Sequence, residues 1–206
     1  MRIAIFGASG ATGRHLVAQA LAKGHTVKAL VRSENSLTID HASLIKVVGE
    51  LSHSTTVQSV IRDAHAVISV LGARKGGSQT ICADGVRSIL QAMLSTGVQR
   101  LIALSAYGAS ETRNASLYIR FVRSVISEKM RDKDAMEEVV RASTTQWTLV
   151  RPPMLTNAKA GGRYHSGVSM RPGITGRISR EDLASFILNI SINEQYIHQA
   201  PVVSIG

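Results

Sequence analysis

The sequence is poor in cysteine, proline and aromatic residues, and these shortages exclude several classes of protein. Its 206 residues include one Cys, four Pro and 4% aromatic side chains. The single cysteine, Cys82, excludes a disulfide framework and a cysteine-rich zinc site. The longest apolar run, 66–71, is far shorter than the roughly 20 residues of a membrane-spanning helix. We therefore expect a folded, cytoplasmic protein that has no membrane partner.

Acidic residues are scarce as well. The chain carries 24 Lys and Arg against 14 Asp and Glu, which gives a formal net charge of +10. Such an excess suggests an anionic partner: nucleic acid, an acidic membrane, a phosphorylated cofactor or an acidic substrate. The most basic stretch, 120–133, is interrupted by Glu128 and Asp132. This mixture favours a solvated helix face over a nucleic-acid groove.

Several catalytic motifs are missing. The seven histidines form no HExxH pair and no other metal spacing, so we expect no metal. No GxSxG segment is present to supply an acyl-transfer serine. No tyrosine is followed four residues later by lysine. The last absence argues against the tyrosine-driven alcohol dehydrogenases that share the fold described next.

Short apolar runs alternate with longer segments of helical periodicity. The runs predict strands at 3–6, 26–31, 45–48, 66–71, 101–104 and 147–150. Helices are predicted at 12–23, 78–96, 117–142 with a break near Ser127, and 180–192, where Ser179 and Asp182 resemble a capping box. Because the runs are continuously apolar, we expect strands buried on both faces.

The alternation predicts one α/β domain spanning 1–206. Its expected architecture is a Rossmann-type, doubly wound, mostly parallel sheet with helices on both faces. The part from 151 to 206 is richer in glycine and loops. We expect this part to contribute the substrate side of the cleft.

A glycine-rich segment, GASGATG, follows the first predicted strand and opens the first helix. Gly7 permits the tight turn, Gly10 lets the backbone approach a pyrophosphate, and Gly13 lets the helix pack close to the sheet. Helix N-terminal amides, with the hydroxyls of Ser9 and Thr12, would then hold the phosphates. The segment predicts dinucleotide binding.

The residue that ends the second predicted strand indicates which dinucleotide is bound. Folds that bind NAD usually place Asp or Glu there to hold the ribose hydroxyl, whereas this strand ends in Arg32 followed by Ser33. A guanidinium pairs with a 2′-phosphate and gains little from a bare ribose. We therefore expect NADPH to be preferred over NADH.

Two strand ends supply candidates for the reaction itself. Ser105 and Tyr107 follow the fifth strand, where a nicotinamide would lie. The Ser105 hydroxyl could orient the nicotinamide or the substrate, or relay a proton, and Tyr107 could line the substrate side. After the sixth strand, Pro152 and Pro153 fix a rigid turn, and Arg151 is either structural or faces an anionic substrate.

Together these motifs resemble the atypical, NAD(P)H-binding, NmrA-like short-chain dehydrogenases that lack the Tyr-x-x-x-Lys pair. Within that group the chain is most similar to the flavin reductase / biliverdin-IXβ reductase family. The matching segments are IAIFGASGATG (3–13), ALVRSENSL (29–37), VVGEL (47–51), AVISVLGAR (66–74), LSAYG (104–108), VRPPML (150–155) and RISREDLA (177–184). They lie in the family's order and spacing, and they span nearly the whole chain.

The resemblance implies a role for each matching position. Glu50, where the family usually has Asp, and Leu51 would flank the adenine, and Ser105 would be the active-site hydroxyl. Met154, also expected beside cofactor and substrate, stands where the family has an active-site histidine. The implied cofactor-binding positions are Gly7, Ser9, Gly10, Ala11, Thr12, Gly13, Arg32, Ser33, Glu50, Leu51, Leu71, Gly72, Arg74, Pro152, Pro153 and Met154.

The function expected from this resemblance is hydride transfer from NADPH to a flavin (FMN, FAD or riboflavin), biliverdin or a quinone. Two alternatives stay open: an NmrA-type sensor that binds NADP(H) without turnover, and an isomerase or dehydratase-like enzyme of secondary metabolism. The expected partner is a planar, anionic small molecule rather than nucleic acid. We expect a monomer or a small homo-oligomer.

Overall fold

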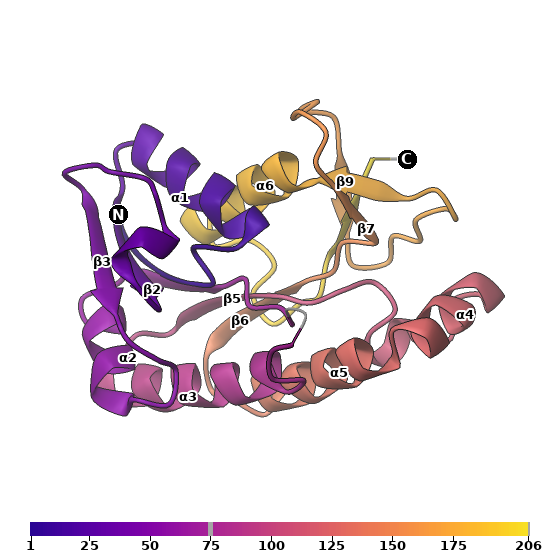
Figure 1. Cartoon of the computed structure of the whole chain (residues 1–206). Helices are drawn as coiled ribbons and strands as arrows, with labels where there is room; N and C mark the ends of the chain where they lie inside the picture. The colour runs from indigo at the N-terminus through magenta and orange to yellow at the C-terminus, as the bar shows by residue number, and fades with distance from the viewer. Residues whose placement is uncertain (74–75, 206) are drawn as a thin grey trace.

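Six parallel strands form the centre of the molecule (Figure 1). The computed structural model describes residues 1–73 and 76–205. The strands lie in the order β3-β2-β1-β4-β5-β6, so the sequence order reverses between β1 and β4. This order is that of the doubly wound dinucleotide-binding fold. The strands are β1 (Arg2–Phe6), β2 (Thr26–Val31), β3 (Leu44–Val48), β4 (Ala66–Ser69), β5 (Arg100–Leu104) and β6 (Gln146–Val150).

Helices cover both faces of this sheet, as expected from the sequence (Figure 1). One face packs against α1 (Ala11–Ala22) and α6 (Arg180–Ile192). The other face packs against α2 (Ser54–Ile61), α3 (Ile81–Thr96) and α5 (Ser127–Arg141). The predicted single α/β domain of Rossmann type is therefore confirmed.

The helix boundaries follow from local chemistry. Gly97, with φ +73°, ends α3, because a residue without a side chain adopts this left-handed conformation at little cost. Ser179 caps α6: its Oγ accepts a hydrogen bond of 2.9 Å from the amide of Asp182. The Asp182 carboxylate accepts from the amides of Gly161 and Gly162, which holds a loop of the C-terminal part against α6.

Two sequence expectations need correction, and one helix was not predicted. The fourth strand ends at Ser69 rather than at 71, because the chain there turns toward the cleft. The strand β3 is not buried on both faces: Ile45 and Val48 are about half exposed, since β3 lies at the sheet edge. The sequence also missed α2, which is only 8 residues long and buries three apolar side chains.

The segment 117–142 forms two helices, α4 (Leu117–Val125) and α5, with the break at Ile126, next to the expected position. Four short strands in the C-terminal part were not predicted. They are β7 (Met154–Thr156), β8 (His165–Gly167), β9 (Arg177–Ser179) and β10 (Val202–Ser204). Strand β7 pairs with β9 in parallel, and β8 pairs with β10 in the antiparallel direction. This part therefore forms a lobe beside β6 (Figure 1).

Candidate functional site

A cleft of about 850 Å³ opens at the carboxyl ends of the parallel strands. Its wall includes the glycine loop after β1, the ends of β2, β4 and β5, and the loop after β3. The cleft therefore lies where the strand order reverses, which is the ligand-binding position of open α/β sheets. Its volume is in the range of small-molecule and cofactor sites.

The glycine loop has a geometry that side chains would disrupt. Gly7 has φ +86°, and a Cβ there would lie 2.8 Å from the carbonyl oxygen of Val70. A Cβ on Gly13 would lie 2.1 Å from the carbonyl oxygen of Gly7 and 2.8 Å from Cα of Ala8. The close contact of Gly13 is thus with the loop's own backbone rather than with the sheet, and it keeps the start of α1 close to the cleft.

The first turn of α1 lies at the cleft. Gly10 is the N-terminal cap and has no side chain to cap the helix amides. The first turn of α1 also holds no acidic residue. Ser9, Gly10, Ala11 and Thr12 line the cleft. Amides left over at a helix N-terminus, together with the helix dipole, bind phosphate groups. The loop therefore fits a pyrophosphate.

The next strands bring further predicted residues to the same cleft. Arg32 lies exposed at the end of β2, and its neighbour Ser33 lies outside the wall that the described residues form. The remaining predicted positions on this side that line the cleft are Glu50, Leu51, Leu71 and Gly72. Arg74, also expected here, lies outside the described residues.

Ser105 lies at the bottom of the cleft, but its hydroxyl proton is directed away from it. The side chain is 4% exposed, and Oγ donates a hydrogen bond of 2.6 Å to Oε1 of Glu137. Since a serine hydroxyl has one proton, Ser105 offers the cleft an acceptor. The predicted role in orienting a ligand fits this geometry better than the predicted proton relay.

Behind Ser105 lies a buried ionic network. Arg151 is 2% exposed, and its Nε donates to Oε1 of Glu137 at 2.9 Å while Nη1 and Nη2 donate to Glu111 at 2.8 and 2.7 Å. A second bond joins Arg151 Nη2 to Glu137 Oε2. Of the two possibilities left open for Arg151, the structural one is therefore observed.

Hydrogen bonds favour the charged forms of Glu111 and Arg151. Hydrogen bonds from Arg151 lower the pKa of Glu111 to about 2, against the opposing effect of burial. Burial disfavours the charge on Arg151, but its hydrogen bonds to Glu137 and Glu111 outweigh that effect and raise its pKa. The fixed carboxylate of Glu137 in turn fixes the Ser105 hydroxyl.

Lys133 is a cleft residue that the sequence did not reveal. It stands in the basic stretch expected to be a solvated helix face, yet it is half-buried and lines the cleft. Its Nζ donates to the carbonyl oxygens of Leu71 at 3.1 Å and Leu104 at 2.5 Å. Its neighbour Asp132 accepts from two amides in the first turn of α3 at 2.9 and 3.0 Å. Helix α5 thereby brings a positive charge to the cleft.

Most of the residues expected beside the nicotinamide do not line the cleft. Tyr107 donates its amide hydrogen to the carbonyl oxygen of Pro152 at 2.9 Å, so the two strand ends run together. Tyr107, Pro152, Pro153 and Met154 lie outside the cleft wall as the described residues define it, and Met154 is 51% exposed. Their predicted roles stay predictions.

Two residues from the C-terminal part reach the cleft instead. Leu155, in β7, and Arg180, at the start of α6, line it, and Nη1 of Arg180 donates to Asn157 Oδ1 at 2.6 Å. Gly85, on α3, also lines the cleft. It packs closely there, since an added Cβ would lie 2.5 Å from Leu71 Cδ1. None of these positions carries a local sequence signal, because their placement depends on how distant elements pack.

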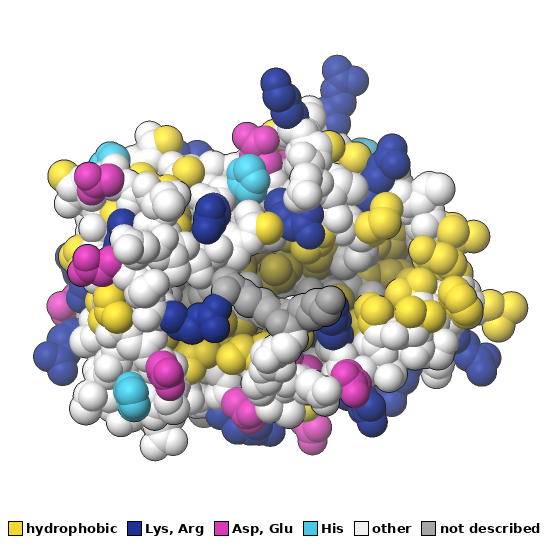
Figure 2. Space-filling model, in the orientation of Figure 1, with side chains coloured by type: hydrophobic (Ala, Val, Ile, Leu, Met, Phe, Trp, Pro, Cys, Tyr) yellow, Lys and Arg dark blue, Asp and Glu magenta, His cyan; other side chains and the backbone are white. Residues whose placement is uncertain are grey.

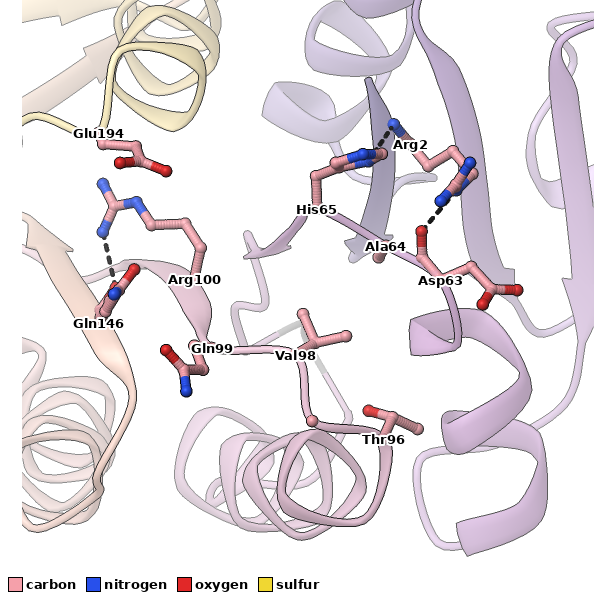
Figure 3. Close-up of a pocket in the computed structure, with 11 residues that line it drawn as sticks. Arg2, Asp63, Ala64, His65, Thr96, Val98, Gln99, Arg100, Gln146 and Glu194 are labelled. Carbon is pink, nitrogen blue, oxygen red and sulfur yellow. Dashed lines mark hydrogen bonds between the residues drawn. The ribbon is translucent and has the colours of Figure 1, made fainter.

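A second hollow, of about 430 Å³, lies at the opposite edge of the sheet (Figure 3). Two of its charged side chains are hydrogen-bonded within the protein: Arg2 Nε donates to the carbonyl oxygen of Asp63 at 2.6 Å. Arg100 donates to the carbonyl oxygens of Gln146 and Ile190, and burial lowers its pKa to about 10. This hollow is open and distant from the glycine loop, so we assign the candidate site to the larger cleft.

The residues that the structure describes form neither a metal cluster nor a membrane-spanning helix. There, no group of three His, Cys, Asp or Glu side chains could hold a metal. No helix in that part of the chain is both long and apolar enough to cross a bilayer. Cys82 lies in the core, where it is 1% exposed, and burial raises the pKa of its thiol.

Known proteins share this fold and parts of this sequence. UPF0659 protein YMR090W of Saccharomyces cerevisiae is 29% identical over 203 residues, which cover 91% of this chain and 86% of that protein. An uncharacterized protein of Mycobacterium tuberculosis, Rv2047c, is 34% identical over 106 residues, which are 52% of this chain and 12% of that much longer protein.

Solved structures match nearly the whole chain at low identity. ChuY, an anaerobilin reductase from Escherichia coli, has a TM-score of 0.86 and 19% identity, over 98% of this chain and 96% of that one. A Veillonella parvula short-chain dehydrogenase/reductase in complex with NADP has a TM-score of 0.82 and 17% identity, over 99% and 94%. These likenesses show the fold.

The family is shown by a separate comparison. The model of the NAD(P)H-binding family matches residues 7–194, so it includes the glycine loop, the cleft and α6. The structure agrees with it at the loop, where the backbone approach leaves no room for a Cβ on Gly7 or Gly13. This chain belongs to the NAD(P)H-binding family of the Rossmann fold.

Proposed function

We propose that the protein is an NADPH-dependent reductase that transfers hydride to a flavin or a related planar acceptor, such as biliverdin or a quinone. The observation that carries the proposal is the continuity of the cleft. One wall runs from the glycine loop and Arg32 to Ser105 and Lys133. A dinucleotide held by its phosphates at the loop would extend its reactive end toward these last two residues.

The chemistry asks little of the protein beyond orientation. NADPH would supply a hydride and become NADP⁺, and the acceptor would gain that hydride and one proton. Ser105 offers a fixed hydrogen-bond acceptor to an amide or ring N–H, because its own hydroxyl proton is donated in a hydrogen bond to Glu137. Lys133 offers positive charge near the end of β5, where an acceptor accumulates negative charge during reduction. The proton would come from solvent.

The cleft also supports an anionic acceptor. Lys133 and Arg180 reach its wall from α5 and α6. The apolar residues Leu71, Leu104 and Leu155 line the same cleft as these two cationic side chains. A flat apolar ring system with a carboxylate or phosphate would satisfy both features. ChuY, which has this fold, is described as an anaerobilin reductase.

Turnover tests the proposal directly. The purified protein should oxidise NADPH when riboflavin, FMN, biliverdin or a soluble quinone is added, as followed by the loss of NADPH absorbance. If NADPH binds tightly but none of these acceptors is reduced faster than in buffer, the reductase proposal fails and the sensor alternative gains support.

Cofactor preference gives a first prediction from a single residue. Arg32→Glu should weaken NADPH binding roughly 30- to 100-fold, because it removes a charge-assisted hydrogen bond to the 2′-phosphate and adds repulsion. NADH binding should change less than about threefold, since it has no such phosphate. Titration calorimetry with both cofactors measures the difference. The control Arg62→Glu makes the same charge change outside the cleft wall, and equal losses for NADPH and NADH would refute the assignment.

Ser105 gives a second prediction. Ser105→Ala should lower kcat on the order of tenfold, because the acceptor facing the nicotinamide end is lost, while NADPH affinity stays within about twofold. Steady-state kinetics and calorimetry separate these effects. Thermal unfolding should be measured in parallel, since Glu137 also loses one donor. Unchanged kcat would leave Ser105 with a structural role only.

A further inference from the structure

The helix α4 presents a stripe of large apolar side chains to solvent. Leu117, Phe121 and Val125 are 80%, 67% and 68% exposed, and their spacing of four residues places them on one side of the helix. Tyr118, on the same side, is 43% exposed. Soluble proteins rarely leave so many large apolar side chains together in water.

The orientation of this stripe is fixed from the other side of α4. Arg123 Nη2 pairs with Asp134 Oδ2 on α5 at 2.6 Å, and Arg123 also donates to the carbonyl oxygen of Gly108. Ile119 packs beside Gly108, where an added Cβ would lie 3.1 Å from its Cγ2. Because these contacts hold the inner side of the helix, the apolar side is directed outward.

The surroundings of α4 form a broad apolar face with a basic rim. Figure 1 shows α4 projecting beyond α5 at one end of the molecule, and Figure 2 shows hydrophobic side chains gathered over that end with Lys and Arg at its margin. Arg113 and Arg120, close to the stripe in sequence, are exposed, as is Lys129. The sequence of α4, LYIRFVRSV, thus combines one apolar side with cationic flanks.

We propose that α4 docks this protein on an anionic lipid surface, with the apolar stripe inserted at the level of the headgroups. Interfacial helices have this combination of Leu and Phe on one side and Arg on the other. The net charge of +10 adds long-range attraction to acidic lipids. The inference revises the expectation of no membrane partner, and it stands independently of the proposed reaction.

A second copy of the chain is a poorer occupant of the same face. Two copies would each carry the formal charge of +10 and would repel one another. A nine-residue helix is only about 14 Å long, and a stable interface covers on the order of 800 Å² on each partner. Charge and size therefore both favour the lipid surface.

Vesicle sedimentation tests the proposal. The full chain should bind vesicles that contain phosphatidylglycerol, bind pure phosphatidylcholine vesicles much less, and be released by added salt. Phe121→Asp should lower the bound fraction on the order of tenfold. The control Leu94→Asp changes an equally exposed leucine on α3, 79% accessible, and should bind like the unchanged protein.

A fluorescent variant gives a second measurement. The native Trp147 is 7% exposed, so Phe121→Trp adds a reporter whose emission should shift to shorter wavelength on anionic vesicles. Absence of binding by the unchanged protein, or an equal loss in Leu94→Asp, would overturn the proposal. So would self-association, seen by light scattering, that Phe121→Asp abolishes while vesicle binding stays the same.

Discussion

Replacing Arg151 by Met is expected to lower the free energy of unfolding by about 3–5 kcal/mol at neutral pH. Arg151 is 2% exposed and is the shared partner of Glu137, which is fully buried, and of Glu111. Methionine fills much of the same volume but leaves the carboxylate of Glu137 buried without its closest cation. Removing one member of a buried ion pair costs more than the pair itself contributes. Urea denaturation measures the loss.

Arg141 provides a matched control for this substitution. It contacts the same two carboxylates, Glu111 at 3.0 Å and Glu137 at 3.7 Å, but its side chain is 37% exposed. Arg141→Met removes the same charge and should cost only about 1 kcal/mol, because solvent screens an exposed pair. Similar losses in the two variants would contradict the view that burial makes the Arg151 network strong.

The pH dependence should differ between the unchanged protein and Arg151→Met. In the unchanged protein hydrogen bonds from Arg151 lower the pKa of Glu111 to about 2 in the folded state, below its ordinary value of 4.5. Its contribution is therefore complete above pH 4.5 and is lost as the pH falls toward 2. In the variant Glu111 loses the hydrogen bonds from Arg151 that lower its pKa, so this pH-dependent contribution is lost as well. The deficit of the variant should shrink as the pH falls.

The fold could be predicted because its signals are local. Each central strand is a short apolar run, and the turn between β1 and α1 is marked by Gly7 and Gly13, whose geometry forbids a side chain. The small elements of the C-terminal part could not be predicted. Strands of three residues, such as β7 and β9, have no periodicity to detect and exist because they pair with each other.

The candidate site likewise contains residues that could be predicted from the sequence and residues that could not. Arg32 and Ser105 follow strands directly, so the rule that ligands bind at carboxyl ends located them from the sequence. Lys133 and Glu137 belong to a helix of mixed charge, and nothing in its sequence distinguishes them from the solvated charged residues beside them. Their positions depend on α5 packing against α3 and β6, which places Glu137 against Arg151. Such pairing is a property of the tertiary structure.

The glycine loop carries the second large effect. Gly13→Ala is expected to weaken NADPH binding on the order of 100-fold, or about 2.7 kcal/mol. The new Cβ would lie 2.1 Å from the carbonyl oxygen of Gly7, so backbone must move to admit it. Any such movement displaces Gly10 and the first turn of α1, where we expect the phosphates to bind. Titration with NADPH measures the loss.

Two other glycines separate this steric effect from a general effect of alanine. At Gly173 a Cβ meets nothing within 4 Å, so Gly173→Ala should leave NADPH binding unchanged. At Gly85 a Cβ would meet the side-chain tips of Leu71 and Leu51, which can move, so Gly85→Ala should have an intermediate effect. The expected order of losses is Gly13, then Gly85, then Gly173. A Gly13→Ala variant with native affinity would show that the loop does not position the phosphates, and it would remove the main structural support for cofactor binding in this cleft.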